Sequence, residues 1–394
     1  MLGDPWLTII GMADDNVRGL PPASRAAIDA AEMIIGGPRH LDLVEAGERG
    51  CPWPVPFDIA PVLAAQGKSC VVLASGDPFW FGAGGSLIAH LDPDDWTVLP
   101  SPSTFSRVAG QLGWRMEEIS CHGLHAAPFA RLRRVLSPKG RMICLVRDGN
   151  SPAGLAAWLS NNGAGAATLT VCERMGGPHQ RIRTTTAADF DIEGIAAPVA
   201  VAIELPPGVG LPRASGLPDD VFAHDRQITK RPVRALTLSA LAPRPGETLW
   251  DIGAGSGSIS VEWCLAGGRS TAFEIKPDRV ANIAQNITDF GIDHLMKVVE
   301  GPSLQMIKEH PKPDAVFVGG GGSAELFDHL MTDLPQGTRL VANGVTLETE
   351  ALLANLHATR GGSLLRIELA QSQPLGTMRG WQPARPVVQW SVTL

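Results

Sequence analysis

The sequence lacks the features that mark several common protein classes. Its 394 residues carry 33 Lys and Arg against 40 Asp and Glu, a net charge of -7 at pH 7. A nucleic-acid-binding surface usually needs a basic patch, so we expect no nucleic-acid partner, although a local basic pocket for an acidic small molecule stays possible. No apolar run is long enough to cross a bilayer, and the start MLGDPWLTIIG has no basic segment, so we expect neither membrane association nor a signal peptide.

Cysteine is scarce and scattered. The six cysteines never form a C-x-x-C pair, and Cys70 and Cys144 lie in apolar runs, where buried free thiols are expected. This pattern predicts a reducing cytoplasm as the compartment. One His pair, in Cys121-His122-x-x-His125, lacks further spaced ligands, so we expect an ordinary loop and no metal.

What the sequence contains is typical of a globular α/β protein. Hydrophobic residues make up 44% and charged residues 19%, and the length suggests two to three domains. Short apolar runs such as WLTIIG, SCVVLAS and RMICLV alternate with helical patterns, which predicts a mostly parallel sheet covered by helices. A segment rich in Pro and Gly predicts a linker at residues 206–219, between a first domain at 1–205 and a second at 220–394.

The strongest local signal is a glycine loop in the second domain. The apolar run TLWDI is followed by Gly253-Ala254-Gly255-Ser256-Gly257, and the next expected strand ends in Glu274. Glycines let a ligand approach the backbone, and an acid at that place can bind ribose hydroxyls. The spacing G-x-G-x-G differs from the G-x-G-x-x-G of dinucleotide sites. It therefore favours an adenosine-bearing ligand without a pyrophosphate, S-adenosylmethionine (SAM), over a plain tight turn with a surface glutamate.

A second glycine run, Gly319-Gly320-Gly321-Gly322-Ser323, follows another expected strand. It lacks the Gly-Lys-Ser/Thr ending of a phosphate-binding loop, and we expect it to face the same pocket. The Asn/Asp-Pro-Pro-aromatic tetrapeptide of many amino-directed methyltransferases is also absent. A carbon or oxygen methyl acceptor is therefore favoured.

The second domain resembles a known family. Asp220-Val221-Phe222, ITKR, VRAL, LWDIGAGSGSIS, PDAVFVGGGG and ANGVTLET are similar to the decarboxylating half of the precorrin-6Y methyltransferases. The resemblance covers nearly all of residues 220–394. The sequence departs from the family pattern at Pro232, where an acid is usual, and at Gly344, where alanine is common.

The first domain resembles the tetrapyrrole (corrin) methylases, in which two α/β lobes clasp SAM. The resemblance rests on AAEMIIGGPRHL, PSPSTFSRVAGQLGW, ERMGGPHQRI and the loop GDPFWFG. It implies backbone contacts to SAM from Gly76, Asp77 and Pro78, and a matching Thr/Ser pair at Ser103 and Thr104. The first loop, usually Gly-x-Gly-Pro-Gly, here reads Gly11-Met12-Ala13-Asp14-Asp15, which puts its contacts in question.

The resemblance implies a two-lobed tetrapyrrole-methylase fold followed by a class I, Rossmann-like methyltransferase fold. It implies a cobalamin-pathway enzyme that converts precorrin-6B and two SAM into precorrin-8. The second domain would methylate C-15 and decarboxylate the ring-C acetate, and the first would methylate C-5. We expect a homo-oligomer. We also assign Thr229, Gly301 and Ser303 to the SAM site and leave the catalytic residues unassigned.

The alternatives stay open at this point. Lys230, Arg231 and Arg234 could bind the carboxylates of the substrate or be solvated charges at a helix start. Asp14-Asp15 is more typical of a polar turn than of an acid–base pair, and the tryptophans are expected in cores, with Trp263 worth testing as a stacking residue. The chain could also be a SAM-dependent methyltransferase for another acidic small molecule, with a degenerate first domain, or a carrier of pathway intermediates.

Overall fold

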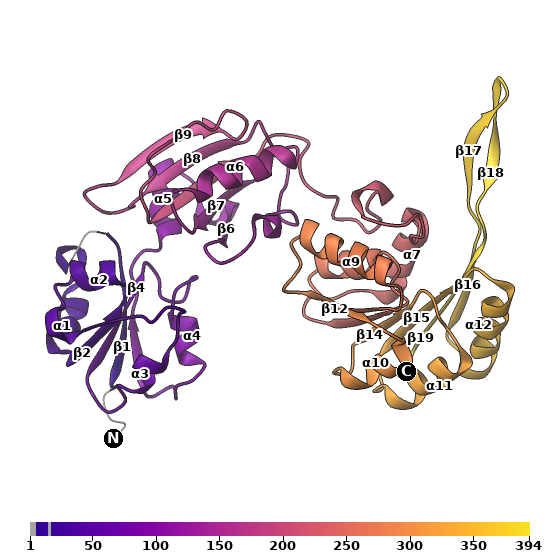
Figure 1. The fold of residues 1–394 in the computed structure, drawn as a ribbon, viewed down its shortest axis with the longest axis horizontal. Coiled ribbons are helices and arrows are strands. Elements are labelled where there is room, and N and C mark those ends of the chain that lie inside the picture. Colours follow the sequence, from indigo (N-terminus) through magenta and orange to yellow (C-terminus); the bar gives the residue numbers. More distant parts are fainter. Residues whose placement is uncertain (1–4, 15–16) are drawn as a thin grey trace. The chain divides into compact units, whose positions relative to one another are not determined.

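The structure is a computed structural model that describes residues 5–14 and 17–394. The chain divides into two compact units, shown in Figure 1. Unit 1 comprises Met1–Phe129 and Leu136–Val209, and unit 2 comprises Ala130–Val135 and Gly210–Leu394. The expected linker at residues 206–219 spans the point where the chain passes from one unit to the other. The short segment Ala130–Val135, which belongs to unit 2, has no counterpart in the sequence-based expectation.

The first lobe of unit 1 is a parallel five-stranded sheet in the order β3-β2-β4-β1-β5. Successive residues of β1 and β4 pack into hydrophobic cores on opposite faces of the sheet. Ile10 and Val71 belong to one core and Ile9 and Val72 to the other, so both faces are covered. The strands are β1 (Leu7–Met12), β2 (Met33–Gly36), β3 (Gly50–Pro52), β4 (Cys70–Ser75) and β5 (Trp96–Leu99). The helices are α1 (Pro22–Ala30), α2 (Pro38–Leu43), α3 (Ala60–Leu63) and α4 (Gly84–Ile88).

The second lobe of unit 1 corrects the expectation of a mostly parallel sheet. Its strand order is β6-β7-β10-β8-β9, and only β6 and β7 pair in parallel. The strands are β6 (Ile119–Gly123), β7 (Arg141–Val146), β8 (Thr168–Glu173), β9 (Arg181–Thr186) and β10 (Val199–Glu204). The helices are α5 (Thr104–Leu112) and α6 (Ser151–Asn161). Phe105 and Val108 of α5 pack against Ile143 and Ala200 of the sheet.

Unit 2 is built on a seven-stranded sheet in the order β13-β12-β11-β14-β15-β19-β16, in which the first five strands are parallel. The strands are β11 (Thr248–Ile252), β12 (Arg269–Glu274), β13 (Met296–Glu300), β14 (Ala315–Val318), β15 (Arg339–Gly344), β16 (Ser363–Ile367) and β19 (Val387–Thr393). Helices cover both faces: α7 (Arg231–Leu241), α8 (Ser258–Leu265), α9 (Pro277–Asp289), α10 (Ser303–Met306), α11 (Ala324–Asp333) and α12 (Leu347–Arg360). Unit 2 has two hydrophobic cores; Trp263 is buried in one and Trp390 in the other.

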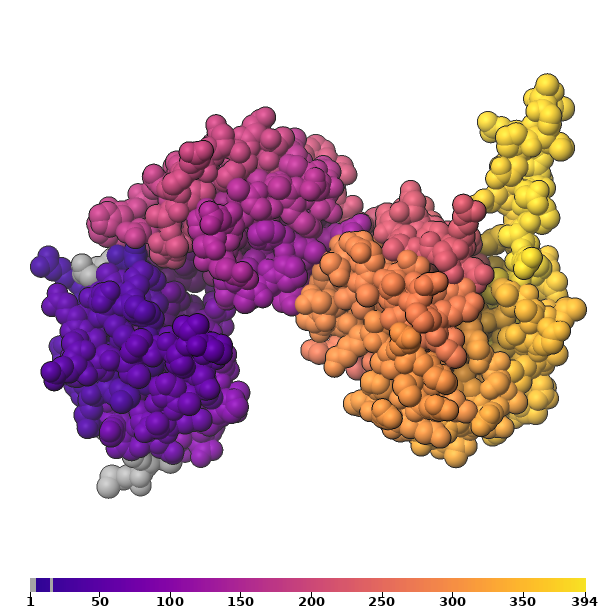
Figure 2. Space-filling view, viewed as in Figure 1, coloured from indigo at the N-terminus to yellow at the C-terminus, as the bar shows by residue number. Residues whose placement is uncertain are grey.

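A two-stranded arm leaves the sheet of unit 2. It consists of β17 (Ala370–Leu375) and β18 (Met378–Pro383), which pair only with each other. Nearly all of its residues are exposed, and the arm extends away from the rest of unit 2 in Figures 1 and 2. Such a hairpin has little stability of its own in water.

Short 3-10 helices complete the chain at Val17–Gly19, Gly47–Arg49, Met116–Glu118, Phe129–Leu132, Asp219–Val221 and Ile307–Glu309. Within the described residues, none of the helices combines the length and apolar character that a membrane span requires. All six cysteines are unpaired, and Cys70 and Cys144 are buried as expected. Burial raises the pKa of the Cys70 thiol to about 12, which leaves it unreactive at neutral pH.

Candidate functional site

The glycine loop of unit 2 connects β11 to α8 at the carboxyl edge of the sheet. Gly253, Gly255 and Gly257 all have left-handed φ angles, of +66°, +61° and +70°. The amides of Gly253 and Ala254 donate hydrogen bonds to the Phe273 carbonyl, at 3.0 and 3.1 Å. A Cβ atom on Gly253 would lie 2.4 Å from the carbonyl oxygen of Gly320. Glycine is therefore required here both by the backbone angle and by the close approach of the second glycine loop.

Glu274, at the end of β12, holds the glycine loop in place. Glu274 is only 3% exposed, and its Oε2 accepts a hydrogen bond from the Gly255 amide at 2.8 Å. Its Oε1 accepts from the amides of Ile275 and Lys276, at 2.9 and 3.0 Å. Oε2 has one backbone partner, so the carboxylate retains capacity to accept from a ligand hydroxyl.

A cavity of about 380 Å³ lies beside this carboxylate. Of the residues expected at the SAM site, Gly253, Glu274 and Ser303 line it. Ala254, Gly255, Ser256, Gly257, Thr229 and Gly301 are not in its lining, although Gly301 directly precedes the lining residue Pro302. Gly320 and Gly321 do line it, which confirms that the second glycine run faces this pocket. Ser323 of the same run also lines it, and the lining residues that sequence reasoning missed are Ile275, Lys276, Arg279, Pro302, Leu304 and Leu326.

A smaller cavity of about 220 Å³ lies on the other side of the second glycine run. Gly320 and Gly321 line both cavities, and the smaller one extends to the end of β15 at Asn343 and Gly344 and to Thr346. Both cavities thus lie beyond the carboxyl ends of parallel strands, where open α/β sheets bind their ligands.

The basic residues at the start of α7 differ in their surroundings. Lys230 and Arg231 are exposed, and Lys230 lies 3.7 Å from Asp219. Arg234 is 0% exposed. Its guanidinium pairs with Glu262 at 2.6 Å and with Asp219 at 3.1 Å. A guanidinium that is fully buried and paired with two carboxylates is shielded from a substrate, so the geometry favours a structural role for Arg234 over the expected substrate contact.

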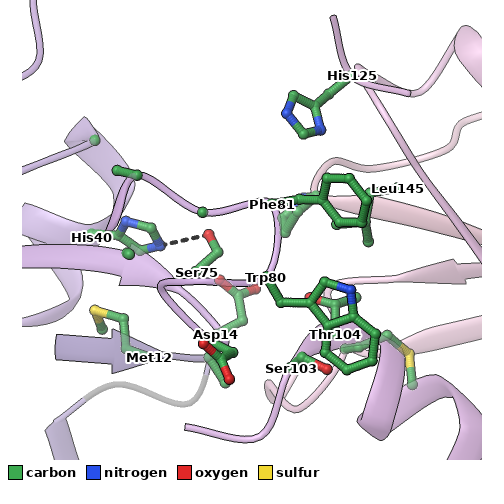
Figure 3. A pocket seen from close by; sticks show the side chains of 18 of the residues that line it. Met12, Asp14, His40, Ser75, Trp80, Phe81, Ser103, Thr104, His125 and Leu145 are labelled. Atoms are coloured by element: carbon green, nitrogen blue, oxygen red, sulfur yellow. Dashed lines mark hydrogen bonds between the residues drawn. The ribbon is translucent and has the colours of Figure 1, made fainter. Parts of the chain in front are cut away.

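Unit 1 contains a cavity of about 400 Å³, seen in Figure 3, which both of its lobes line. Asp77, Ser103 and Thr104 are among its lining residues, whereas Gly76 and Pro78 shape the loop behind it. Gly76 has a φ of +61°, and its amide donates to the Met12 carbonyl at 2.7 Å. The Pro78 carbonyl accepts from the Gly84 amide at 2.9 Å, which closes the turn.

The altered first loop takes part in this cavity. Met12, Ala13 and Asp14 line it, and Asp15 lies outside the described residues. A Cβ atom on Gly11 would lie 1.9 Å from the Gly76 carbonyl oxygen, so the two loops meet in a contact that only glycine permits. Asp14 forms an ion pair with Arg39 and so is not free to act as an acid–base group.

His40 and Ser75 lie in the same pocket, with His40 Nε2 at 3.1 Å from Ser75 Oγ (Figure 3). Burial, aided by the neighbouring Arg39 charge, lowers the pKa of His40 to about 4. The imidazole is therefore neutral at physiological pH. Arg39, His40, Trp80, Phe81 and Arg147 also line the cavity and were not assigned to it from the sequence; Trp80 and Phe81 belong to the GDPFWFG loop, whereas Arg147 reaches the cavity from the second lobe.

Trp263, considered as a stacking residue, is 0% exposed. It packs in a core of unit 2, and its indole N–H donates to the Glu247 carbonyl at 3.4 Å. It cannot reach a substrate, so the expectation that tryptophans pack in cores holds here.

Both units place glycine loops at the carboxyl ends of parallel strands beside a cavity of ligand size, and the family matches identify them as methyltransferase units. Residues 7–191 match the family described as Tetrapyrrole (Corrin/Porphyrin) Methylases, and residues 220–394 match the Precorrin methyltransferase domain. The fold is therefore a two-lobed tetrapyrrole-methylase fold followed by a class I, Rossmann-like methyltransferase fold.

A curated relative from Sinorhizobium sp, named Precorrin-6Y C(5,15)-methyltransferase [decarboxylating], is 45% identical over 99% of this chain and 96% of its own length. The chain belongs to the precorrin-6Y C(5,15)-methyltransferase (decarboxylating) family. A shorter relative, the cobalt-precorrin-7 C(5)-methyltransferase of Salmonella typhimurium, is 30% identical over 48% of this chain and 96% of its own length. A crystal structure of the C-terminal domain of the Rhodobacter capsulatus precorrin-6Y C5,15-methyltransferase is 56% identical, covers 47% of this chain and 100% of its own, and has a TM-score of 0.46.

Proposed function

We propose that this chain methylates precorrin-6B twice with SAM, at C-5 in unit 1 and at C-15 in unit 2. Unit 2 would also remove the ring-C acetate carboxyl as carbon dioxide, so that the product is precorrin-8. The observation that carries the proposal is the presence of two separate loop-bound cavities of similar volume, about 400 Å³ in unit 1 and about 380 Å³ in unit 2. The half-length relative named as a C(5)-methyltransferase supports an independent role for one half.

The residues of unit 2 fit SAM as the methyl donor. The Glu274 carboxylate can accept from a ribose hydroxyl, and the left-handed glycines leave the backbone of the loop open to a close ligand. In unit 1 the loops at Met12–Asp14 and at Asp77, with Ser103 and Thr104, form the corresponding wall. SAM supplies a methyl group activated by its sulfonium, so neither unit needs a nucleophilic side chain.

The protein then contributes mainly alignment and exclusion of water. Positioning of donor and acceptor can supply up to about 7–11 kcal/mol of a reaction barrier. For decarboxylation, the electron pair released with carbon dioxide enters the conjugated macrocycle, which acts as its own electron sink. The walls of the smaller cavity at Asn343 and Thr346 lie next to the donor pocket and are suited to hold the acceptor side of the reaction.

The test incubates the whole chain with precorrin-6B and methyl-labelled SAM and follows the product by mass spectrometry. The wild type is expected to add two labelled methyls and to release carbon dioxide. Gly11→Val, whose side chain would collide with the Gly76 carbonyl, is expected to add one methyl with carbon dioxide still lost. Gly110→Ala, at a position where a Cβ meets no atom within 4 Å, is the control. A wild type that transfers no label would refute the proposal.

A second candidate is a methyltransferase for another acidic small molecule, with a unit 1 that no longer binds a donor. The Asp14–Arg39 ion pair in the altered loop favours it, because it places a carboxylate where the family has proline. In that case Gly11→Val would leave the number of transferred methyls unchanged at one.

We further propose that the chain forms a homo-oligomer in the cytoplasm. The exposed arm supports assembly, because Leu375, Met378 and Trp381 are 70%, 77% and 77% exposed and sit on a hairpin with both edges unpaired. Sedimentation of the wild type and of Trp381→Ser tests this: the wild type should sediment as an oligomer and the variant as a smaller species. The unpaired cysteines support a reducing compartment.

A further inference from the structure

The pocket of unit 1 contains two aromatic rings that neither the glycine loops nor the core accounts for. Trp80 and Phe81 follow the Gly76-Asp77-Pro78 turn, line the cavity, and are 37% and 50% exposed. Figure 3 shows both rings among the side chains that line the cavity. Large aromatic side chains that stay this exposed inside a pocket are typical of binding surfaces.

The two rings are fixed rather than loose. Both pack against Phe105, which is 0% exposed, with ring centroids 5.0 Å away for Trp80 and 5.8 Å away for Phe81. A Cβ atom on Gly123 of β6 would lie 2.6 Å from the Phe81 ring, so the glycine leaves the space that the ring occupies. The second lobe is therefore shaped around Phe81.

The backbone of Phe81 is strained. Its φ is +58°, in the left-handed region that bulky residues rarely adopt. Glycine would fit this backbone better, yet the chain has phenylalanine. Strain of this kind persists where a side chain is needed in a particular place, and it is most common at functional sites.

We propose that Trp80 and Phe81 form an aromatic shelf that receives the flat face of the tetrapyrrole macrocycle during methylation in unit 1. The inference rests on the proposed function and adds the substrate-binding surface. A tetrapyrrole and a methyl donor cannot both be enclosed in about 400 Å³, so part of the macrocycle must lie at the mouth, where the two rings are exposed. A conjugated macrocycle offers aromatic side chains an extended face for offset stacking.

A basic side chain near the shelf, that of Arg147, suits a peripheral carboxylate of such a substrate. Arg147 lines the same cavity and is exposed, and its Nε donates to the His125 carbonyl at 3.0 Å. No carboxylate lies within ion-pair distance of its guanidinium among the residues that the structure describes. Arg147 is therefore available for a forked contact with a substrate carboxylate.

The experiment compares Phe81→Ala and Phe81→Gly in the full chain. Both remove the ring, but only glycine relieves the left-handed strain, so the glycine variant should melt at a higher temperature than the alanine variant. Both should raise the KM for the tetrapyrrole at the C-5 step by about tenfold, from lost stacking and apolar contact. The SAM dissociation constant of unit 1 and the C-15 methylation by unit 2 should stay as in the wild type.

Phe79→Ala is the matched control, because Phe79 is 41% exposed in the same segment but does not line the cavity. An equal rise in the KM for Phe79→Ala would overturn the shelf. The shelf would also fail if the Phe81 variants raised the SAM dissociation constant and left the KM for the tetrapyrrole unchanged, because the rings would then belong to the donor site. If the wild type transfers no methyl to C-5, the proposed function fails. Equilibrium dialysis of the tetrapyrrole then still tests the shelf, since Phe81→Ala should bind it about tenfold more weakly at one site than the wild type does.

Discussion

Replacement of the buried Arg234 tests whether this residue stabilises unit 2 or binds the substrate. In Arg234→Ala, the Glu262 carboxylate, 5% exposed, loses its guanidinium partner and keeps only the amides of Gly216 and Leu217, at 2.6 and 3.0 Å. The carbonyl of Thr229 loses a donor at 2.5 Å, and Phe222 loses the cation over its ring at 4.7 Å. Removing one partner of a buried ion pair costs about 3–5 kcal/mol, which is the expected loss in the free energy of unfolding of unit 2.

The assay for this loss must resolve unit 2 from unit 1, because a chain of two units need not unfold in one step. Hydrogen exchange in increasing urea, followed in peptides from α7 and α8, reports on unit 2 alone. Arg231→Ala is the matched control: Arg231 lies on the first turn of the same helix and is exposed, so its loss should change stability by no more than about 0.5 kcal/mol. Wild-type exchange in Arg234→Ala together with a raised KM for the tetrapyrrole would refute the structural role and restore the substrate contact expected from sequence.

Three further predictions concern unit 2. Gly253→Ala places a Cβ 2.4 Å from the Gly320 carbonyl at a φ of +66°, so titration calorimetry should show one SAM site lost and one retained; two retained sites would contradict this. Glu274→Ala should weaken SAM binding in unit 2 by roughly 1–3 kcal/mol, and an unchanged affinity would remove this carboxylate from the site. Burial raises the pKa of Asp251 to about 6, above its ordinary value, so the folded state holds the proton more tightly than the unfolded chain. Asp251 should therefore contribute up to roughly 3 kcal/mol to the stability of unit 2 as the pH falls from about 6 to about 4, and Asp251→Asn should lack that contribution; equal pH dependence of the two urea midpoints would count against it.

The sequence predicted the strands that are buried on both faces, and it did so for a physical reason. Runs such as Cys70–Ser75 and Thr248–Ile252 are predominantly apolar because helices cover both sides of a parallel sheet. The antiparallel sheet of the second lobe was missed because strand direction is set by partners far along the chain. The arm was missed because Ala370–Leu375 is exposed on both faces and carries no alternating pattern.

Glycine spacing indicated the candidate site of unit 2, since a left-handed turn beside a ligand leaves few other residues possible, and the family resemblance indicated that of unit 1. The remaining lining residues could not be found in this way. Arg147 reaches the cavity of unit 1 from the second lobe, and no local pattern distinguishes it from surface residues. Arg234 illustrates the same limit: a charge at a helix start looks the same in sequence whether it is solvated or buried against a carboxylate.

The altered first loop shows which part of a family pattern carries the structure. Gly11 is the position at which the loop meets the Gly76 carbonyl, and there the glycine is kept. At Met12, Ala13 and Asp14 the side chains line the cavity, so other residues can stand there while the two loops still meet. The Asp14–Arg39 ion pair fixes the new loop to the start of α2. The contact at Gly11 therefore keeps the two loops together, and the residues that replace glycine and proline further along the loop change the chemistry of the cavity wall while the pocket remains.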